Sequence, residues 1–114
     1  MRSRCETIGL IALVALAACG TDVDPTCTKS TLTYETFGAP FMSDWCLGCH
    51  SAGVDAAMRQ LAPIDVNFDT IAEVRTQSRS ILETTSTMQT MPPAGGPSDS
   101  DRELLAEWLS CGAP

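Results

Sequence analysis

The chain has 114 residues, with 7 lysines and arginines against 14 aspartates and glutamates, and a net charge of −7 at pH 7. A chain of this length is enough for one compact domain. Its acidic balance excludes nucleic acid as a partner, because phosphates repel a negative surface. The same balance favours partner proteins that have basic docking surfaces.

The first segment of the chain has the pattern of an export signal. Two arginines precede an apolar run, 8–18, which is too short to span a bilayer and is typical of a signal-peptide core. The run ends in Leu-Ala-Ala-Cys-Gly at 16–20, which resembles the lipobox of bacterial lipoproteins. The resemblance implies a signal peptide over 1–18 and lipidation of Cys19. An ordinary signal peptide is the alternative.

By this resemblance the mature protein is exported and held at a bacterial membrane by its lipid anchor. Gly20 after the cysteine favours the outer membrane, with the domain facing the periplasm. Loss of residues 1–18 removes two arginines and one glutamate, so the net charge of −7 becomes −8. The small polar residues that follow predict a flexible tether over 19–31, and the domain itself covers 32–114.

Four cysteines of the mature protein remain after Cys19. Cys27 and Cys111 lie near the two ends of the domain, and Cys46 and Cys49 lie close together. In an oxidising compartment two leftover thiols usually form a disulfide, so Cys27 and Cys111 are a candidate pair. The sequence leaves the geometry of this pair open.

Helical periodicity predicts three helices joined by long loops. The first begins with Thr33 as its N-cap and is either kinked at Pro40 or begins anew there. The second covers 69–82. A loop follows at 84–97, where the residues are mostly Thr, Ser, Gln, Gly and Pro. The apolar stripe of the first helix is Tyr34, Phe37, Phe41 and Trp45.

The last segment, 98–109, is the clearest predicted helix. Ser100 and Glu103 form a capping box at its start, and Gly112 supplies its C-terminal stop. Because no long strand pattern occurs, the sequence predicts an all-α domain. The predicted buried face of the last helix is Leu104, Leu105, Trp108 and Leu109.

Cys46, Cys49 and His50 form a CxxCH motif directly after the first predicted helix, and this is the attachment motif of c-type haem. Two thiols about one helical turn apart can reach the two vinyl groups of a porphyrin and form thioethers. The adjacent imidazole then reaches the iron as the proximal ligand. His50 is the only histidine, which excludes bis-histidine coordination within one copy. The predicted cofactor is therefore one covalently attached haem c.

Three other uses of Cys46 and Cys49 fit the sequence less well. A thioredoxin-like redox pair needs a βαβ context that the sequence lacks. A zinc site shared with Cys27 and Cys111 is disfavoured, because such sites prefer reducing compartments and tighter paired spacing. A disulfide between Cys46 and Cys49 themselves is sterically awkward inside a helix.

The distal ligand is predicted to be a methionine, since a thioether sulfur is the usual partner of histidine in electron-transfer cytochromes c. Met91 is the predicted ligand, because the two prolines after it stiffen the loop that must hold the sulfur. Met88 in the same loop is the second candidate. Met58 is too close to the CxxCH motif to reach the opposite face, and Met42 lies on the first helix. A gap-filling role in the core is the alternative for Met91.

A helix leading into CxxCH, a later Met-Pro loop and a closing helix with Trp108 resemble a small single-haem class I cytochrome c over 33–111. The resemblance implies about three or four short helices with long loops wrapped around a haem. In that family the first and last helices cross through an aromatic contact. Here the contact would place Phe37, Gly38 or Phe41 against Trp108.

The resemblance implies a membrane-anchored electron carrier rather than an enzyme, because a His/Met-ligated iron has no open position for a substrate. A haem-based peroxidase or a gas or redox sensor with an open distal site is the alternative. The lack of a distal histidine and of an acid–base group beside the Met loop disfavours it. Arg75 and Arg79, one turn apart, are candidate partners of the haem propionates, although they are equally consistent with ordinary surface arginines.

Overall fold

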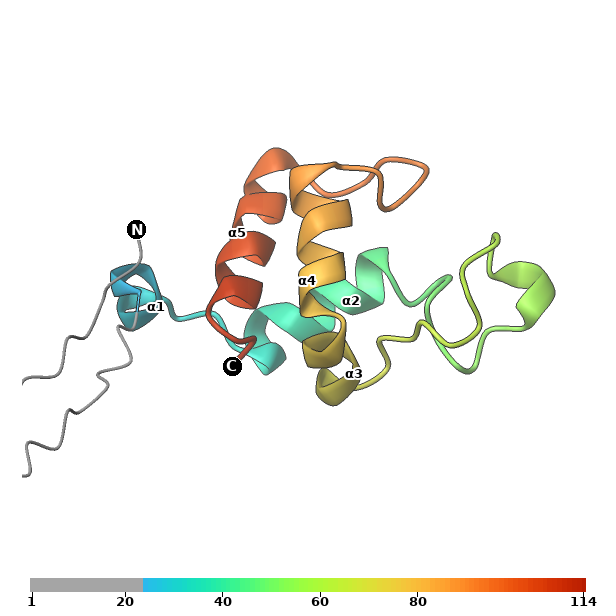
Figure 1. Ribbon diagram of the computed structural model, residues 1–114, viewed down its shortest axis with the longest axis horizontal. Helices are drawn as coiled ribbons and strands as arrows, with labels where there is room; N and C mark the ends of the chain where they lie inside the picture. Colours follow the sequence, from blue (N-terminus) through green and yellow to red (C-terminus); the bar gives the residue numbers. More distant parts are fainter. Residues whose placement is uncertain (1–23) are drawn as a thin grey trace, which may run out of the picture.

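The computed structural model describes residues 24–114, which fold into helices and loops (Figure 1). The predicted signal peptide at 1–18 and the predicted lipidation site, Cys19, lie outside the described residues. Residues 24–114 contain no strand, which confirms the predicted all-α class. Among these residues, no helix has the length and apolar character needed to cross a membrane.

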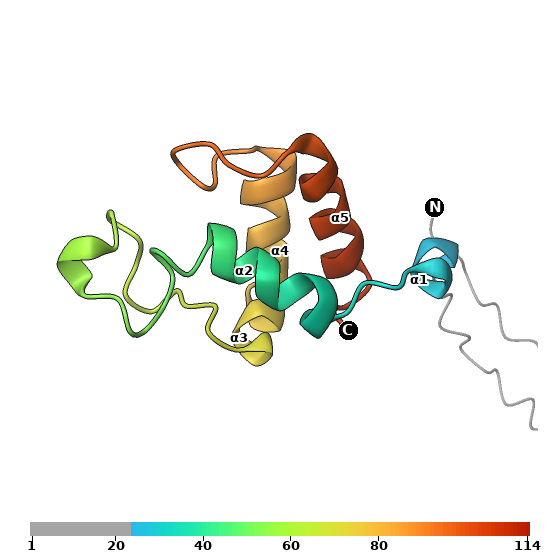
Figure 2. The ribbon, with the colours of Figure 1, turned by 180° about the vertical axis from the view of Figure 1, so that it is seen from behind.

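Two long helical segments stand side by side and a third runs across them. Figures 1 and 2 show α5 beside the continuous segment formed by α4 and η3, with η1 and α2 running across this pair. Helix α1 and the loop between α2 and α3 lie at opposite ends of the domain. The helices in chain order are α1 (Pro25–Lys29), η1 (Tyr34–Gly38), α2 (Ala39–Trp45), η2 (Ala56–Met58), α3 (Ile71–Thr76), α4 (Ser78–Ile81), η3 (Leu82–Thr87) and α5 (Asp99–Ser110).

The first predicted helix begins at its expected cap and continues without a break past Pro40, changing from η1 to α2 at Ala39. The Thr33 hydroxyl accepts a hydrogen bond from the Thr36 amide at 3.2 Å. The turn of η1 is wide, because the Gly38 amide donates to the Thr33 carbonyl at 3.1 Å, five residues back. Helix α2 then begins with Pro40 in its first turn, where no amide hydrogen is needed.

The middle helical segment extends beyond its predicted end. It starts at the Thr70 cap, breaks at Gln77 and continues as α4 and η3 to Thr87. Residues 84–87, predicted as loop, are therefore helical. Their hydroxyls find backbone partners: Thr84 donates to the Ser80 carbonyl at 2.8 Å, and Ser86 donates to the Arg102 carbonyl at 2.9 Å.

Helix α5 is capped by Ser98 rather than by the predicted box of Ser100 and Glu103. Ser98 has extended backbone angles, and its hydroxyl accepts from the Asp101 amide at 3.1 Å. The earlier cap is favoured because the Ser98 hydroxyl also donates to the Asp101 carboxylate at 2.8 Å, so Ser98 and Asp101 make two contacts at this end of the helix. Of the predicted buried face, Leu105, Trp108 and Leu109 are buried, whereas Leu104 is exposed. Gly112 ends the helix with a φ of +87°, as predicted.

The core is centred on Trp108, against which the first helical segment packs at Gly38. A Cβ atom added to Gly38 would come within 2.5 Å of Cη2 of Trp108, so only glycine allows this approach. Phe37 meets the Trp108 ring edge-on, with ring centroids 6.0 Å apart. Phe41 is also buried and stacks at an angle on Phe37 instead. The rest of the buried core is Met42, Phe68, Val74, Ile81, Leu105, Leu109 and Ala113.

Part of the predicted tether is folded against the domain. Residues 25–29 form the single turn of α1, capped by the Asp24 carboxylate, which accepts from the Thr26 amide at 2.8 Å. A disulfide joins Cys27 in this turn to Cys111 at the end of α5. The bridge closes a loop across 84 positions and ties both ends of the domain together.

Candidate functional site

A cavity of about 390 Å³ opens between the end of α2, the loop before α3, the α4–η3 segment and the loop at 88–98, here called the Met-Pro loop. Its volume lies in the range of pockets that bind small ligands and cofactors. The residues predicted to carry the chemistry come from the turn after α2 and from the Met-Pro loop, and they line this one cavity. They are Cys46, Cys49, His50 and Met91.

The His50 ring is fixed from two sides. Its Nδ1 lies 3.0 Å from the Val66 carbonyl oxygen, and its face stacks on Phe68 with ring centroids 4.8 Å apart. A carbonyl can only accept, so Nδ1 carries the proton and donates it. In the neutral ring the other nitrogen, Nε2, then carries the free lone pair and is available as a metal ligand.

The turn that contains the two cysteines continues from α2. The His50 and Cys49 amides both donate to the Cys46 carbonyl, at 2.9 and 3.1 Å. Cys46 and Cys49 are free thiols. Burial raises the pKa of the Cys46 thiol from 9.0 to about 12, because a thiolate is poorly solvated there.

The zinc alternative does not fit the structure. Cys27 and Cys111 are bonded to each other and are therefore unavailable as ligands. Within residues 24–114, no group of three or more His, Cys, Asp or Glu side chains is placed to hold a metal ion. One histidine and one methionine that ligate a haem iron would not form such a group, because methionine is not among these residue types.

The methionines differ in their relation to the cavity. Met91 lines it, whereas Met88 is exposed and does not. Met42 is buried in the core, and Met58 is exposed on the loop before α3. The geometry therefore favours Met91 over Met88 as the distal candidate.

The predicted propionate partners, Arg75 and Arg79, do not line the cavity. Arg75 instead donates from Nε and Nη2 to the Ala113 carbonyl, at 3.1 and 2.9 Å, because the end of α5 leaves this acceptor without a helical partner. Arg79 is exposed on α4. The structure therefore does not bring these two arginines to the cavity, and their contact with propionates stays a prediction.

Arg59 is the cation that the structure places in the cavity wall. It is only 1% exposed, and all the hydrogen bonds of its guanidinium go to backbone carbonyls. Sequence reasoning missed it, because it lies in a loop where no periodic pattern distinguishes buried from exposed positions. The acceptors are Ser51 at 2.5 Å, Pro63 at 2.7 Å, Val66 at 3.0 Å and Ala62 at 3.4 Å.

The chain just after His50 is held by Asp69. The Asp69 carboxylate accepts hydrogen bonds from the Ser51 hydroxyl and from the Ala52 amide, at 2.5 and 2.8 Å. These bonds lower the pKa of Asp69, with the Ser51 hydroxyl as the larger cause. The contact fixes the start of the loop that carries Arg59 and Val66.

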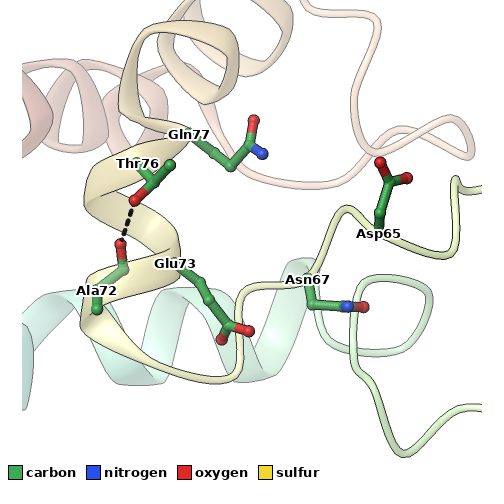
Figure 3. Close-up of a pocket in the computed structure, with 6 residues that line it drawn as sticks. All are labelled: Asp65, Asn67, Ala72, Glu73, Thr76 and Gln77. Carbon is green, nitrogen blue, oxygen red and sulfur yellow. Dashed lines mark hydrogen bonds between the residues drawn. The ribbon is translucent and has the colours of Figure 1, made fainter.

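A smaller hollow of about 260 Å³ lies beside α3 (Figure 3). It is lined by polar side chains, and its Thr76 hydroxyl donates to the Ala72 carbonyl at 2.9 Å. Its Glu73 carboxylate already accepts from the amide and hydroxyl of Thr70 as part of the helix cap. One of its two acidic groups is engaged in this way, and none of the predicted site residues lines the hollow, so the larger cavity is the candidate site.

The larger cavity thus brings together two thiols, an imidazole with a defined tautomer, a thioether and a buried guanidinium. This set can attach and ligate a flat metal-containing cofactor that carries negative substituents. No family model, curated protein sequence or solved structure matches the chain.

Proposed function

We propose that the protein is a small electron-transfer cytochrome c, with one haem covalently attached in the 390 Å³ cavity. The observation that carries this proposal is the hydrogen bond from Nδ1 of His50 to the Val66 carbonyl. It leaves Nε2 as a ligand in the same cavity that the two free cysteines and Met91 line.

The residues of the cavity fit such a cofactor. Cys46 and Cys49 would hold it through thioethers, and His50 and Met91 would ligate its iron. Arg59 in the wall would offset the charge of the propionates, a role that the sequence had suggested for Arg75 and Arg79. When bound, haem supplies one-electron chemistry at its iron.

The protein's own contribution is orientation and exclusion of water. Phe68 and the Val66 carbonyl keep the imidazole ring of His50 from rotating. A fixed ring favours a small change in geometry between the two oxidation states. Apolar residues of the wall, such as Ile81 and Pro92, would lower the local polarity around the bound cofactor. A fixed ligand set in a largely apolar wall suits electron transfer better than substrate turnover.

The close approach of Gly38 to Trp108 supports the finer proposal of a class I cytochrome c fold, because that family's first and last helices cross at an aromatic contact. Lipidation at Cys19 and a location at the outer membrane remain parts of the same proposal. The acidic net charge would steer basic redox partners toward the domain.

The test is an absorption spectrum of the mature protein, expressed with machinery for c-type haem maturation, in both oxidation states. We expect haem that stays with the chain on denaturation and a sharp low-spin ferrous α-band. The weak near-infrared ferric band of sulfur ligation should be lost in Met91→Ala and kept in the matched variant Met88→Ala.

The other outcomes are equally clear. A high-spin spectrum that shifts with carbon monoxide would indicate an open distal site, and thus a peroxidase or sensor. Loss of the near-infrared band in Met88→Ala alone would reassign the distal ligand. No covalent haem in a chain that matures normally would overturn the proposal.

A further inference from the structure

Arg102 of α5 donates to three backbone carbonyls, one in η3 and two in the Met-Pro loop. Arg102 is 7% exposed, and its guanidinium donates from Nε to the Pro97 carbonyl at 3.1 Å. Its Nη1 donates to the Met91 carbonyl at 2.9 Å and also to the Thr85 carbonyl. Thr85 lies in η3, and Met91 and Pro97 lie in the loop that Figure 1 shows between η3 and α5. One buried side chain therefore ties the loop to the helix.

The backbone of Met91 is held on both sides. Its amide donates to the Thr84 carbonyl at 3.1 Å, and its carbonyl accepts from Arg102. Its side chain is 37% exposed, so core packing contributes little to its position. The place of the Met91 sulfur at the cavity is thus set mainly through the backbone.

The rest of the loop is held by fewer contacts. Gly95 and Gly96 have φ angles of +84° and +151°, which favour glycine. The Gly95 amide donates to the Pro92 carbonyl at 3.1 Å, and Gly96 lies close to the Trp45 ring. Charge-assisted hydrogen bonds from a guanidinium are roughly twice as strong as those between neutral groups. Arg102 is therefore the strongest restraint on this loop that the contacts provide.

We propose that Arg102 is a positioning residue for the distal ligand: through the Met91 carbonyl it sets how long the thioether stays on the haem iron. The inference rests on the proposed function, since it requires a haem iron with Met91 as its ligand. The sulfur leaves and returns as a neutral two-electron donor, so no proton or redox partner is involved. Arg102 thereby keeps the distal site closed to outside ligands and favours electron transfer.

The test compares haem-loaded Arg102→Met, Arg102→Lys and the unmodified protein. The measured quantity is the rate at which imidazole, added to the ferric protein, replaces the native distal ligand. We expect Arg102→Met to raise this rate by roughly 10- to 100-fold, as for the loss of a charge-assisted hydrogen bond. Arg102→Lys should fall between the two, because an ammonium keeps the charge but cannot reach several carbonyls in a plane. Limited proteolysis should show faster cleavage within 88–97 in the same order.

Arg75→Met is the matched control, because Arg75 also donates two hydrogen bonds to a backbone carbonyl, at Ala113, away from the cavity. We expect it to lose thermal stability without a change in the imidazole rate. If both Arg102 variants also lose thermal stability without a change in the imidazole rate, the inference is overturned and the proposed function is left intact. A missing near-infrared band in the unmodified protein would instead overturn the His/Met ligation itself. If Arg102→Met does not fold, Arg102→Lys alone decides.

Discussion

His50 and Arg59 share one hydrogen-bond acceptor: Nδ1 of the imidazole and Nη2 of the guanidinium each lie 3.0 Å from the Val66 carbonyl oxygen. In the segment between α2 and α3, His50 lies near the start, Arg59 near the middle and Val66 near the end. A carbonyl with two lone pairs can satisfy both donors. The shared contact links the position of the proximal ligand candidate to a buried positive charge.

We expect Arg59→Met to destabilise the haem-loaded protein by about 3 kcal/mol, because it leaves several buried carbonyls without a donor. It should also lower the reduction potential by on the order of 60 mV, a tenfold change in a one-electron equilibrium, since a nearby positive charge favours the ferrous state. Urea denaturation and a potentiometric titration measure the two effects.

Two further variants separate charge from hydrogen bonding in this prediction. Arg59→Lys keeps the charge and should retain most of the potential while losing stability. Arg79→Met removes an exposed charge on α4 and should change neither quantity by much. Equal shifts in potential for Arg59→Met and Arg79→Met would show that Arg59 has no special relation to the site.

Gly38→Ala should destabilise the protein by about 1–3 kcal/mol, the usual range for overpacking. An added Cβ would come within 2.5 Å of the Trp108 ring, so either the ring or the whole of η1 must shift. Thermal denaturation of the haem-loaded protein measures the loss. Gly53→Ala is the control, because its Cβ would have only an ordinary contact, 3.6 Å from Ser51 Oγ. A Gly38→Ala protein as stable as the control would contradict this packing.

The parts of the fold that sequence predicted are those with local patterns. The buried face of α5 is predicted by the helical spacing of Leu105, Trp108 and Leu109. The CxxCH motif is recognised from the spacing of its two cysteines and the histidine that follows them. The same periodicity could have revealed Arg102, which lies three positions before Leu105 on the buried face. A charged residue at a core position is easily taken for a surface residue.

Other features depend on contacts that no local pattern encodes. Arg59 is buried because carbonyls from separate loop positions converge on its guanidinium. Arg75 does not reach the cavity, because its guanidinium donates to the Ala113 carbonyl after α5. The helical turn at 84–87 consists of Thr and Ser, which by themselves favour a loop. It persists because Thr85 is buried and Ser86 bonds to α5.

Replacing both Cys27 and Cys111 by serine should lower the free energy of unfolding by about 3–5 kcal/mol, since the bridge closes a loop across 84 positions. Urea denaturation of the haem-loaded protein, with and without a reductant, measures the loss. The reductant should destabilise the unmodified protein and leave the double variant unchanged. Equal stability of all four samples would mean that the bridge does not constrain the unfolded chain.

The Cys46 thiol should resist alkylation in the haem-free chain, because burial raises its pKa to about 12. The Cys49→Ala variant of 24–114 leaves Cys46 as its one free thiol, since Cys27 and Cys111 are bonded. Near pH 9 a thiol with its ordinary pKa of 9.0 is half ionised, whereas a thiol with a pKa near 12 is ionised to roughly one part in a thousand. Iodoacetamide should therefore react at least about 100-fold more slowly than with the same variant in urea.

The pH dependence of this reaction shows in which direction ionisation of the Cys46 thiol changes the stability of the fold. The unfolded chain loses the thiol proton first, so the folded form keeps its full stability below pH 9.0 and loses it as pH rises toward about 12. Alkylation in the folded chain should accordingly keep rising above pH 9.0, where the reaction in urea levels off. Matching pH profiles in the two solvents would show that the haem-free chain does not bury Cys46. Burial would then follow, rather than precede, attachment of the cofactor.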